Sequence, residues 1–320
     1  MASDETKAPA AAPASSFAKL IVGPLALLAM GSIWGLGFAL SKVAGEAGAH
    51  PVGLIIWETL GSGALLLMVC AMLGRYPRPN RVYLRNYLVN GLLGFTIPGP
   101  ILFWAAPHLP VAVLTLMIPM APLLTYVLIL FSRTERFDPV RALGVIAGFV
   151  GVGCIVLPEG SLPEPGQVGW VLLALGAASF YALQNLYIAL HSPPDSDVLT
   201  QTTGMLLLGG LTALPLAAGM DGFLWPTFPM TIPVQAAAVM LVINAGMMML
   251  FVWVVRTVGP VFASMTANVI TLAGVFWGWV IFQETASGWI WAAIAAMALG
   301  VALVTLRRPV PIERGDRTES

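Results

Sequence analysis

Glu58 is the residue whose type and position in this chain most strongly indicate chemistry. It lies in the segment IIWETLGSG, six residues into an apolar stretch that is long enough to cross a membrane. A rise of 1.5 Å per residue places it about 9 Å below the nearer membrane surface. A lone acid at that depth is costly and usually faces a cavity, where it can carry a proton or bind an ammonium group. The alternative is a protonated side chain that hydrogen-bonds a neighbouring helix.

Neutral polar residues near the middle of other apolar stretches form a second group of candidates. Amides and hydroxyls in hydrocarbon need partners, so they either join helices or line a wet cavity. As a set they suit a polar solute, whether zwitterionic or uncharged. Trp34 lies deeper than an interfacial anchor and is a further candidate for the pathway wall. The polar members of the group are Tyr181, Gln184, Asn185, Asn244, Asn268 and Thr271.

Four prolines interrupt two adjacent apolar stretches. The segment TIPGP contains Pro98 and Pro100, and the segment IPMAP contains Pro119 and Pro122. Each proline removes a backbone hydrogen bond and frees a carbonyl group. Broken helices can point backbone groups at a substrate and can also act as hinges. The sequence therefore predicts either hinges or static kinks at these positions.

Ten apolar stretches must position these residues. The chain has 320 residues, 58% of them hydrophobic and 9% charged, whereas soluble domains carry roughly 25% charged residues. If the N-terminus is inside, Lys42 is the one base of the 15 Lys and Arg residues that falls outside. This asymmetry predicts cytoplasmic termini. The expected spans are 20–42, 52–73, 87–107, 109–131, 139–157, 168–190, 198–219, 234–256, 259–282 and 287–306.

The two halves of the chain contain a repeat. The segment LPVAVLTLMIPMAPLLTYVLILFSRTE ends at Glu135, and VGPVFASMTANVITLAGVFWGWVIFQE ends at Glu284. Five spans per half, an odd number, require the halves to be inverted relative to each other, which places a substrate site near the midplane between them. We expect an all-α integral membrane protein with ten transmembrane helices in two inverted five-helix repeats. The expected segments are a disordered cytoplasmic N-terminus (1–19), repeats at 20–157 and 168–306, a linker at 158–167 and a cytoplasmic tail (307–320).

The ordered and duplicated motifs resemble the EamA-type transporters of the drug/metabolite transporter superfamily. The matching segments are IWGLGFALSK, PMAPLLTYVLILFSRTERFDPVRALGVIAGFVGVGCIVL and VGPVFASMT with the later FQE. The resemblance implies a ten-helix inner-membrane carrier that exports amino acids or other small metabolites, and it places Trp34 in the central region. Thr271 stands where the family usually has proline, so we expect a weaker kink in the ninth span.

These residues predict a secondary transporter, either proton-coupled or facilitative, with a small-molecule substrate and membrane lipid around it. Metal-ligand spacing, a nucleotide-binding motif and a basic, aromatic nucleic-acid surface are absent from the sequence, so no enzyme activity, cofactor, metal or nucleic-acid partner is expected. A passive channel and an integral-membrane enzyme acting on lipid are the alternatives. Small residues in spans five and ten predict close helix packing within a monomer or a homodimer interface. They are Gly144, Gly148, Gly151, Gly153, Ala292, Ala296 and Gly300.

Overall fold

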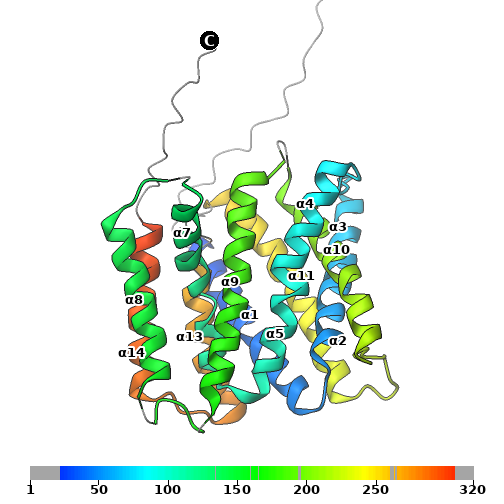
Figure 1. Ribbon diagram of the computed structural model, residues 1–320. Helices are drawn as coiled ribbons and strands as arrows, with labels where there is room; N and C mark the ends of the chain where they lie inside the picture. The colour runs from blue at the N-terminus through cyan, green and yellow to red at the C-terminus, as the bar shows by residue number, and fades with distance from the viewer. Residues whose placement is uncertain are drawn as a thin grey trace, which may run out of the picture.

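The structure, a computed structural model, is a bundle of long helices that lie side by side (Figure 1). It describes residues 22–133, 135–158, 160–164, 166–193, 196–259, 263 and 265–306. The expected terminal segments 1–19 and 307–320 lie outside these residues. Nine crossings are apolar helical stretches of at least 18 residues, and the tenth is the shorter apolar helix α13. Within the described residues the elements confirm the expected ten-helix, all-α membrane fold.

Each half of the chain contributes five crossings. The first half consists of α1 (Gly23–Glu46), α2–η2–α3 (Pro51–Ile56, Trp57–Gly61, Ser62–Met72), α4–η3–α5–η4 (Arg81–Gly91, Leu92–Thr96, Pro98–Ala105, Ala106–His108), α6–α7 (Val111–Leu116, Met120–Phe131) and α8 (Pro139–Val156). The second half consists of α9 (Gln167–His191), α10 (Val198–Gly219), α11 (Ile232–Thr257), α13 (Thr266–Phe282) and α14 (Gly288–Thr305).

The packing of the helices follows an inverted repeat. In the first half α1 packs against α13 and α11, and the corresponding helix α9 packs against α7 and α5. The fifth and tenth crossings, α8 and α14, pack against each other. Their contact uses small residues, because a Cβ atom at Gly144 would lie 2.7 Å from the carbonyl oxygen of Gly300. Each half therefore contributes the same type of surface to the interface between them.

Two of the crossings are broken at prolines. Pro98 begins α5 directly after the π-helical turn η3, and Pro119 lies in the turn between α6 and α7. Pro100 and Pro122 lie in the first turns of α5 and α7, where the backbone N–H needs no partner within the helix. In contrast, α13 continues unbroken through Thr271. The breaks thus differ between the halves, and a hinge role for the prolines stays a prediction.

The third crossing begins earlier than the sequence suggests. Helix α4 starts at Arg81, six residues before the expected boundary, because the side chain of Asn80 accepts a hydrogen bond from the backbone N–H of Tyr83 and caps it. Its first turn contains arginines, which the hydropathy of the sequence assigns to a loop. The longer helix brings Asn86 into the crossing.

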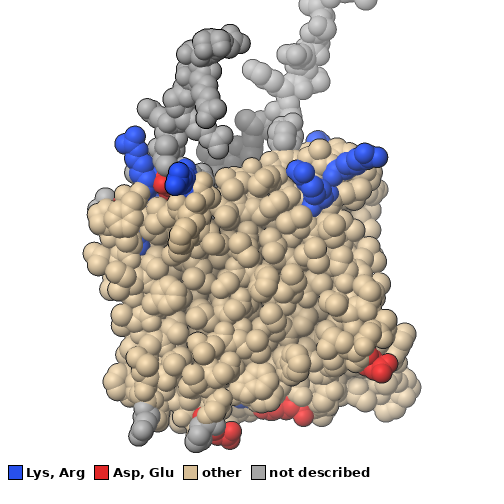
Figure 2. All heavy atoms as spheres, viewed as in Figure 1, with Lys and Arg blue, Asp and Glu red and all other residues tan. Residues whose placement is uncertain are grey.

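The described Lys and Arg side chains gather mainly at one end of the bundle, whereas acids occur at both ends (Figure 2). We define the basic end as the end where α1 begins; it has the arginines at 75, 78, 81, 85, 133, 136, 141 and 256. The opposite, acidic end has Glu46, Glu164, Asp221 and Glu284. Lys42 is the one Lys or Arg there among the described residues. The observed ends agree with the charge asymmetry expected from the sequence.

Candidate functional site

Glu58 lies on a π-helical turn. The second crossing is α-helical on both sides of η2, which spans Trp57–Gly61. Single π turns widen a helix locally and are frequent at functional sites. The hydroxyl of Thr59, the next residue, donates to the carbonyl oxygen of Ile55 at 2.5 Å. The candidate acid therefore lies in an irregular turn. The sequence of this segment contains no signal that predicts such a turn.

The neighbours of Glu58 along its helix show which helices surround this stretch of the crossing. One turn before it, Ile55 packs against Gly99 of α5. One turn after it, the hydroxyl of Ser62 donates to the carbonyl oxygen of Leu241 in α11 at 2.9 Å. Glu58 therefore lies on a stretch of the second crossing that contacts both α5 and α11. These two helices belong to opposite halves of the chain.

The carboxylate of Glu58 has no bonded partner in the described part of the chain. No hydrogen bond or ion pair joins it to another described residue, and its side chain is only partly buried. Tyr181 of α9 lies close enough for its hydroxyl to interact electrostatically with this carboxylate. An unpaired acid within the bundle, next to a phenol from the other half, is available for a proton or for a cationic group of a solute.

Two further predicted residues are buried at helix contacts. The side-chain amide of Asn244 in α11 donates to the hydroxyl of Ser62 at 3.3 Å. The hydroxyl of Thr271 in α13 donates to the carbonyl oxygens of Ala267 at 3.2 Å and Thr115 at 3.4 Å. Both contacts join the halves of the chain. Asn244 lies one helical turn from the level of Glu58, whereas Thr271 lies at the seam between α6 and α13.

The amides of the sixth crossing face different neighbours. Gln184 donates to the backbone carbonyl oxygen of Asn90 at 3.1 Å, whereas Asn185 is exposed and donates to the hydroxyl of Thr125 at 3.3 Å. Asn268 lines a small apolar crevice of about 60 Å³ between α6, α13 and α14. The structure therefore does not gather all the predicted polar residues around one point.

Trp34 lies on the face of α1 that packs against α11. Its ring is tilted 54° to the ring of Phe251, with the centroids 6.2 Å apart. The side chain is partly buried. The structure thus places Trp34 between the halves, and its role as a wall of the pathway stays a prediction.

A cluster of buried amides was not anticipated from the sequence. Asn86 donates to the carbonyl oxygen of His191 at 2.9 Å, and its own oxygen accepts from the amides of Asn90 and Gln201. The side-chain oxygens of Asn90 and Gln201 have no hydrogen-bond partner among the described residues. The sequence contains two asparagines four residues apart, Asn86 and Asn90, which could have indicated this cluster. The expected third span began at residue 87 and so excluded Asn86.

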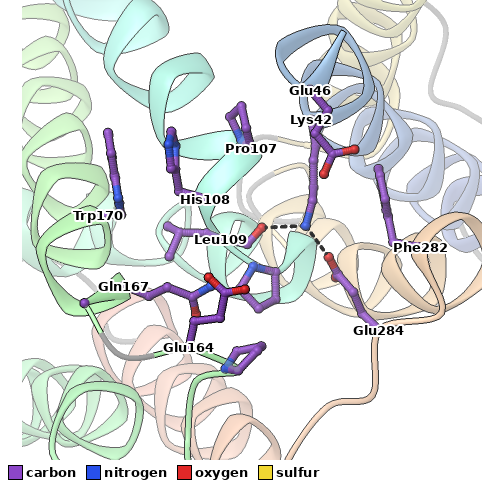
Figure 3. Close-up of a pocket in the computed structure, with 13 residues that line it drawn as sticks. Lys42, Glu46, Pro107, His108, Leu109, Glu164, Gln167, Trp170, Phe282 and Glu284 are labelled. Atoms are coloured by element: carbon purple, nitrogen blue, oxygen red, sulfur yellow. Dashed lines mark hydrogen bonds and ion pairs between the residues drawn. The ribbon is translucent and has the colours of Figure 1, made fainter.

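The second unanticipated feature is an ion pair at the acidic end. Lys42 at the end of α1 and Glu284 after α13 are 2.6 Å apart between Nζ and Oε1. They lie at a cavity of about 570 Å³, the vestibule, which is also lined by His108 and Trp170 (Figure 3). The sequence marked Lys42 as the one base expected outside and Glu284 as the end of the repeat. It gave no indication that they pair, because they lie far apart along the chain.

The described residues contain no group of three or more His, Cys, Asp or Glu side chains that could hold a metal ion. The expectation that the chain uses no metal or cofactor stays a prediction.

Comparison with known proteins shows which family the chain is similar to. Residues 21–157 match the EamA-like transporter family. The chain is 25% identical over 294 residues to the uncharacterized inner membrane transporter YedA of Escherichia coli (strain K12). The alignment covers 88% of this chain and 90% of that protein. It is 25% identical over 247 residues to the protein PecM of Dickeya dadantii (strain 3937), with 73% and 80% covered.

A partial relative and a solved structure agree with this result. The uncharacterized transporter YvbV of Bacillus subtilis (strain 168) is 30% identical over 160 residues, which cover 49% of this chain and 50% of that protein. One crystal structure superposes with a TM-score of 0.59 at 17% identity, over 89% of this chain and 96% of the other, and shows the same fold. The family match over residues 21–157 and the relatives named as transporters support an EamA-type transporter of the drug/metabolite transporter superfamily, and the ten-crossing fold is consistent with it.

Proposed function

We propose that this protein is an alternating-access secondary transporter that exports small polar metabolites, amino acids or related compounds, across the bacterial inner membrane. The two inverted halves rock against each other around a solute held between them. Transport is either coupled to protons or facilitative. The amino-acid class comes from the family resemblance, and the site chemistry is compatible with it.

The observation that carries the proposal is the unpaired carboxylate of Glu58. It lies on a stretch of the second crossing that contacts α5 and α11, and it interacts electrostatically with Tyr181 from the opposite half. An acid in a membrane span without a bonded partner is costly unless a proton or a solute stabilises it. Glu58 therefore accepts a proton or the ammonium group of a solute, and Tyr181 offers a hydroxyl to the same solute.

The charges of the spans limit the substrate class. In the described spans the two bases with buried or nearly buried side chains, Lys42 and Arg141, are paired with Glu284 and Glu135. A solute with two negative charges would need unpaired Lys or Arg side chains for charge balance. A zwitterionic, cationic or neutral solute is therefore favoured over a phosphorylated one.

The orientation follows from the arginines. Cytoplasmic loops of membrane proteins carry an excess of Lys and Arg, so the basic end faces the cytoplasm and the acidic end faces outward. Both termini then lie in the cytoplasm, and α1 runs outward from it. The relative YedA is named as an inner membrane transporter, which supports the same membrane for this chain.

Reconstituted protein tests this function. Proteoliposomes with the purified carrier are assayed for uptake and counterflow with a panel of labelled amino acids, with and without a pH gradient. We expect trans-stimulation by at least one of them. The Glu58→Gln variant should lose at least about tenfold in exchange rate or lose the response to the gradient, as removal of a buried charged contact does. Glu46→Gln, which removes an acid at the membrane surface, is the matched control.

The same assay separates the alternatives. A passive channel conducts the labelled solute without trans-stimulation, and a lipid-modifying enzyme changes a lipid covalently without moving solute. Full exchange by Glu58→Gln at every pH would remove Glu58 from the proposed site. Absence of counterflow with all solutes, in protein that remains folded, would contradict the carrier.

A further inference from the structure

The carboxylate of Glu284 joins three segments at the acidic end. Its Oε1 pairs with Lys42 of α1 at 2.6 Å, and its Oε2 accepts the backbone N–H of Val111, the first residue of α6, at 2.8 Å. The same ammonium of Lys42 donates to the carbonyl oxygen of Leu109 at 3.1 Å (Figure 3). Glu284 belongs to the second half and the other three residues to the first. This set, the Lys42–Glu284 latch, therefore holds the two halves together.

The end of α13 is shaped to present this carboxylate. Gln283 has a left-handed backbone with φ of 56°, which reverses the chain, and the N–H of Glu284 donates to the carbonyl oxygen of Gly278 at 3.1 Å. This reversal folds the side chain of Glu284 back over the last turn of the helix. A Cβ atom at Gly278 would lie 2.5 Å from Oε2, so the absence of a side chain at 278 makes room for the carboxylate.

The latch is less exposed than the ionic contact between the halves at the other end. The side chains of Lys42 and Glu284 are 12% and 17% exposed. At the basic end the described ion pair between halves joins Arg75 and Asp197 at 3.8 Å, with 52% and 25% exposure. Exposed ion pairs contribute little, whereas breaking a largely buried pair on one side is strongly destabilising. Of these two ion pairs, the latch is therefore the stronger contact between the halves.

The latch lies between the vestibule and the seam of the two halves. Lys42 and Glu284 line the vestibule on one side. On the other side Thr115, one turn beyond Val111, is fully buried, and its hydroxyl donates to the carbonyl oxygen of Val111 at 3.0 Å. Thr115 packs directly against Gly274 of α13. These contacts hold α6 against α13 beside the vestibule.

We propose that the Lys42–Glu284 latch is the outer gate of the carrier and must break each time the transporter opens to the outside. This inference rests on the proposed alternating access and on the orientation of the acidic end. The vestibule supplies the water that hydrates the two charges once they separate. The open arrangement keeps Lys42 on α1 and carries Glu284 away with α13.

Thiol labelling of a buried reporter tests the gate without any substrate. Thr115→Cys is placed in a background with Cys70→Ala and Cys154→Ala, and a membrane-impermeant thiol reagent is added from the outer side. Glu284→Gln and Lys42→Gln should each increase the labelling rate about tenfold, because each removes the charge pair that holds the closed state. Gly278→Ala should also increase it, although both charges remain. Labelling at the parent rate in all three variants would overturn the gate.

Matched controls separate gating from general loosening. Glu46→Gln removes a vestibule acid that makes no ion pair with a described residue, and it should leave the labelling of Thr115→Cys unchanged. His108→Cys, an exposed reporter in the same vestibule, should label equally fast in every background. An equal increase at both reporters, or with Glu46→Gln, would show unfolding of this end and contradict a specific latch.

Crosslinking tests whether the gate must open during transport. Lys42→Cys and Glu284→Cys are joined by a bifunctional thiol reagent with a reducible spacer, which should abolish counterflow until the spacer is reduced. The control pair Glu46→Cys and His108→Cys joins two positions in the first half and should leave counterflow intact. Unchanged counterflow through the crosslinked latch would refute the gate. A parent without counterflow would contradict the proposed function instead, while the labelling result would still stand.

Discussion

At the scale of single residues, the polar groups in the spans differ in how completely they are paired. Glu58 has no bonded partner among the described residues, whereas Asn244 and Thr271 donate to groups on neighbouring helices. In hydrocarbon such donations typically contribute about 0.6 kcal/mol and at most about 1.7 kcal/mol. Pairing thus ranks the candidates: the unpaired acid is free to meet a solute, and the paired groups hold helices together.

Asn244 offers a test of this ranking. Asn244→Ala removes the hydrogen bond to Ser62 and should lower the free energy of unfolding in detergent by about 0.5–1.5 kcal/mol. A double-mutant cycle with Ser62→Ala measures the coupling between the two side chains. Additive losses would contradict the contact. A large change in solute affinity without loss of stability would assign Asn244 to the substrate site.

At the scale of elements, the contact between α8 and α14 depends on residues without side chains. A Cβ atom at Gly144 would lie 2.7 Å from the carbonyl oxygen of Gly300. One at Gly151 would lie 2.7 Å from Cγ of Met297. A Cβ atom at Gly153 would lie 3.7 Å from its nearest neighbour, Cδ1 of Leu157, which is an ordinary van der Waals distance. Of these glycines, Gly144 and Gly151 thus serve packing within the chain.

Gly144→Ala and Gly153→Ala form a matched pair for this contact. Gly144→Ala should lower the free energy of unfolding by about 1–3 kcal/mol, because the backbone of α14 must move to admit the methyl group. Gly153→Ala should leave stability unchanged or raise it by up to about 1 kcal/mol, since alanine favours helix. Thermal unfolding in detergent measures both. Equal effects would contradict the close approach of these helices.

At the scale of the whole molecule, the charges at the two ends predict the orientation in the membrane. Single cysteines at Arg81→Cys and Glu46→Cys, in a background lacking Cys70 and Cys154, report on the two ends. In intact cells an impermeant thiol reagent should label Glu46→Cys, whereas Arg81→Cys should react only after permeabilisation, because arginine-rich loops stay in the cytoplasm. The reverse pattern would invert the proposed direction of every crossing.

The sequence by itself determined the class of the protein, the ten crossings and the separation of the charges. These properties follow from runs of apolar residues and from loop charges, which are local along the chain. The repeat ending at Glu135 and Glu284 likewise predicted inverted halves. Proline positions located the breaks near Pro98 and Pro119, because proline removes a backbone N–H from the helix, although α10 continues through Pro215.

Only the tertiary structure decided which polar residues meet. Lys42 and Glu284 lie 242 positions apart, and no local pattern encodes their contact. The π-helical turn at Glu58 has no recognisable sequence signal, and the partners of Asn244 and Gln184 depend on which helices become neighbours. The physical reason is that pairing in a membrane bundle is set by the packing of whole helices, which the order of residues along any one helix does not specify.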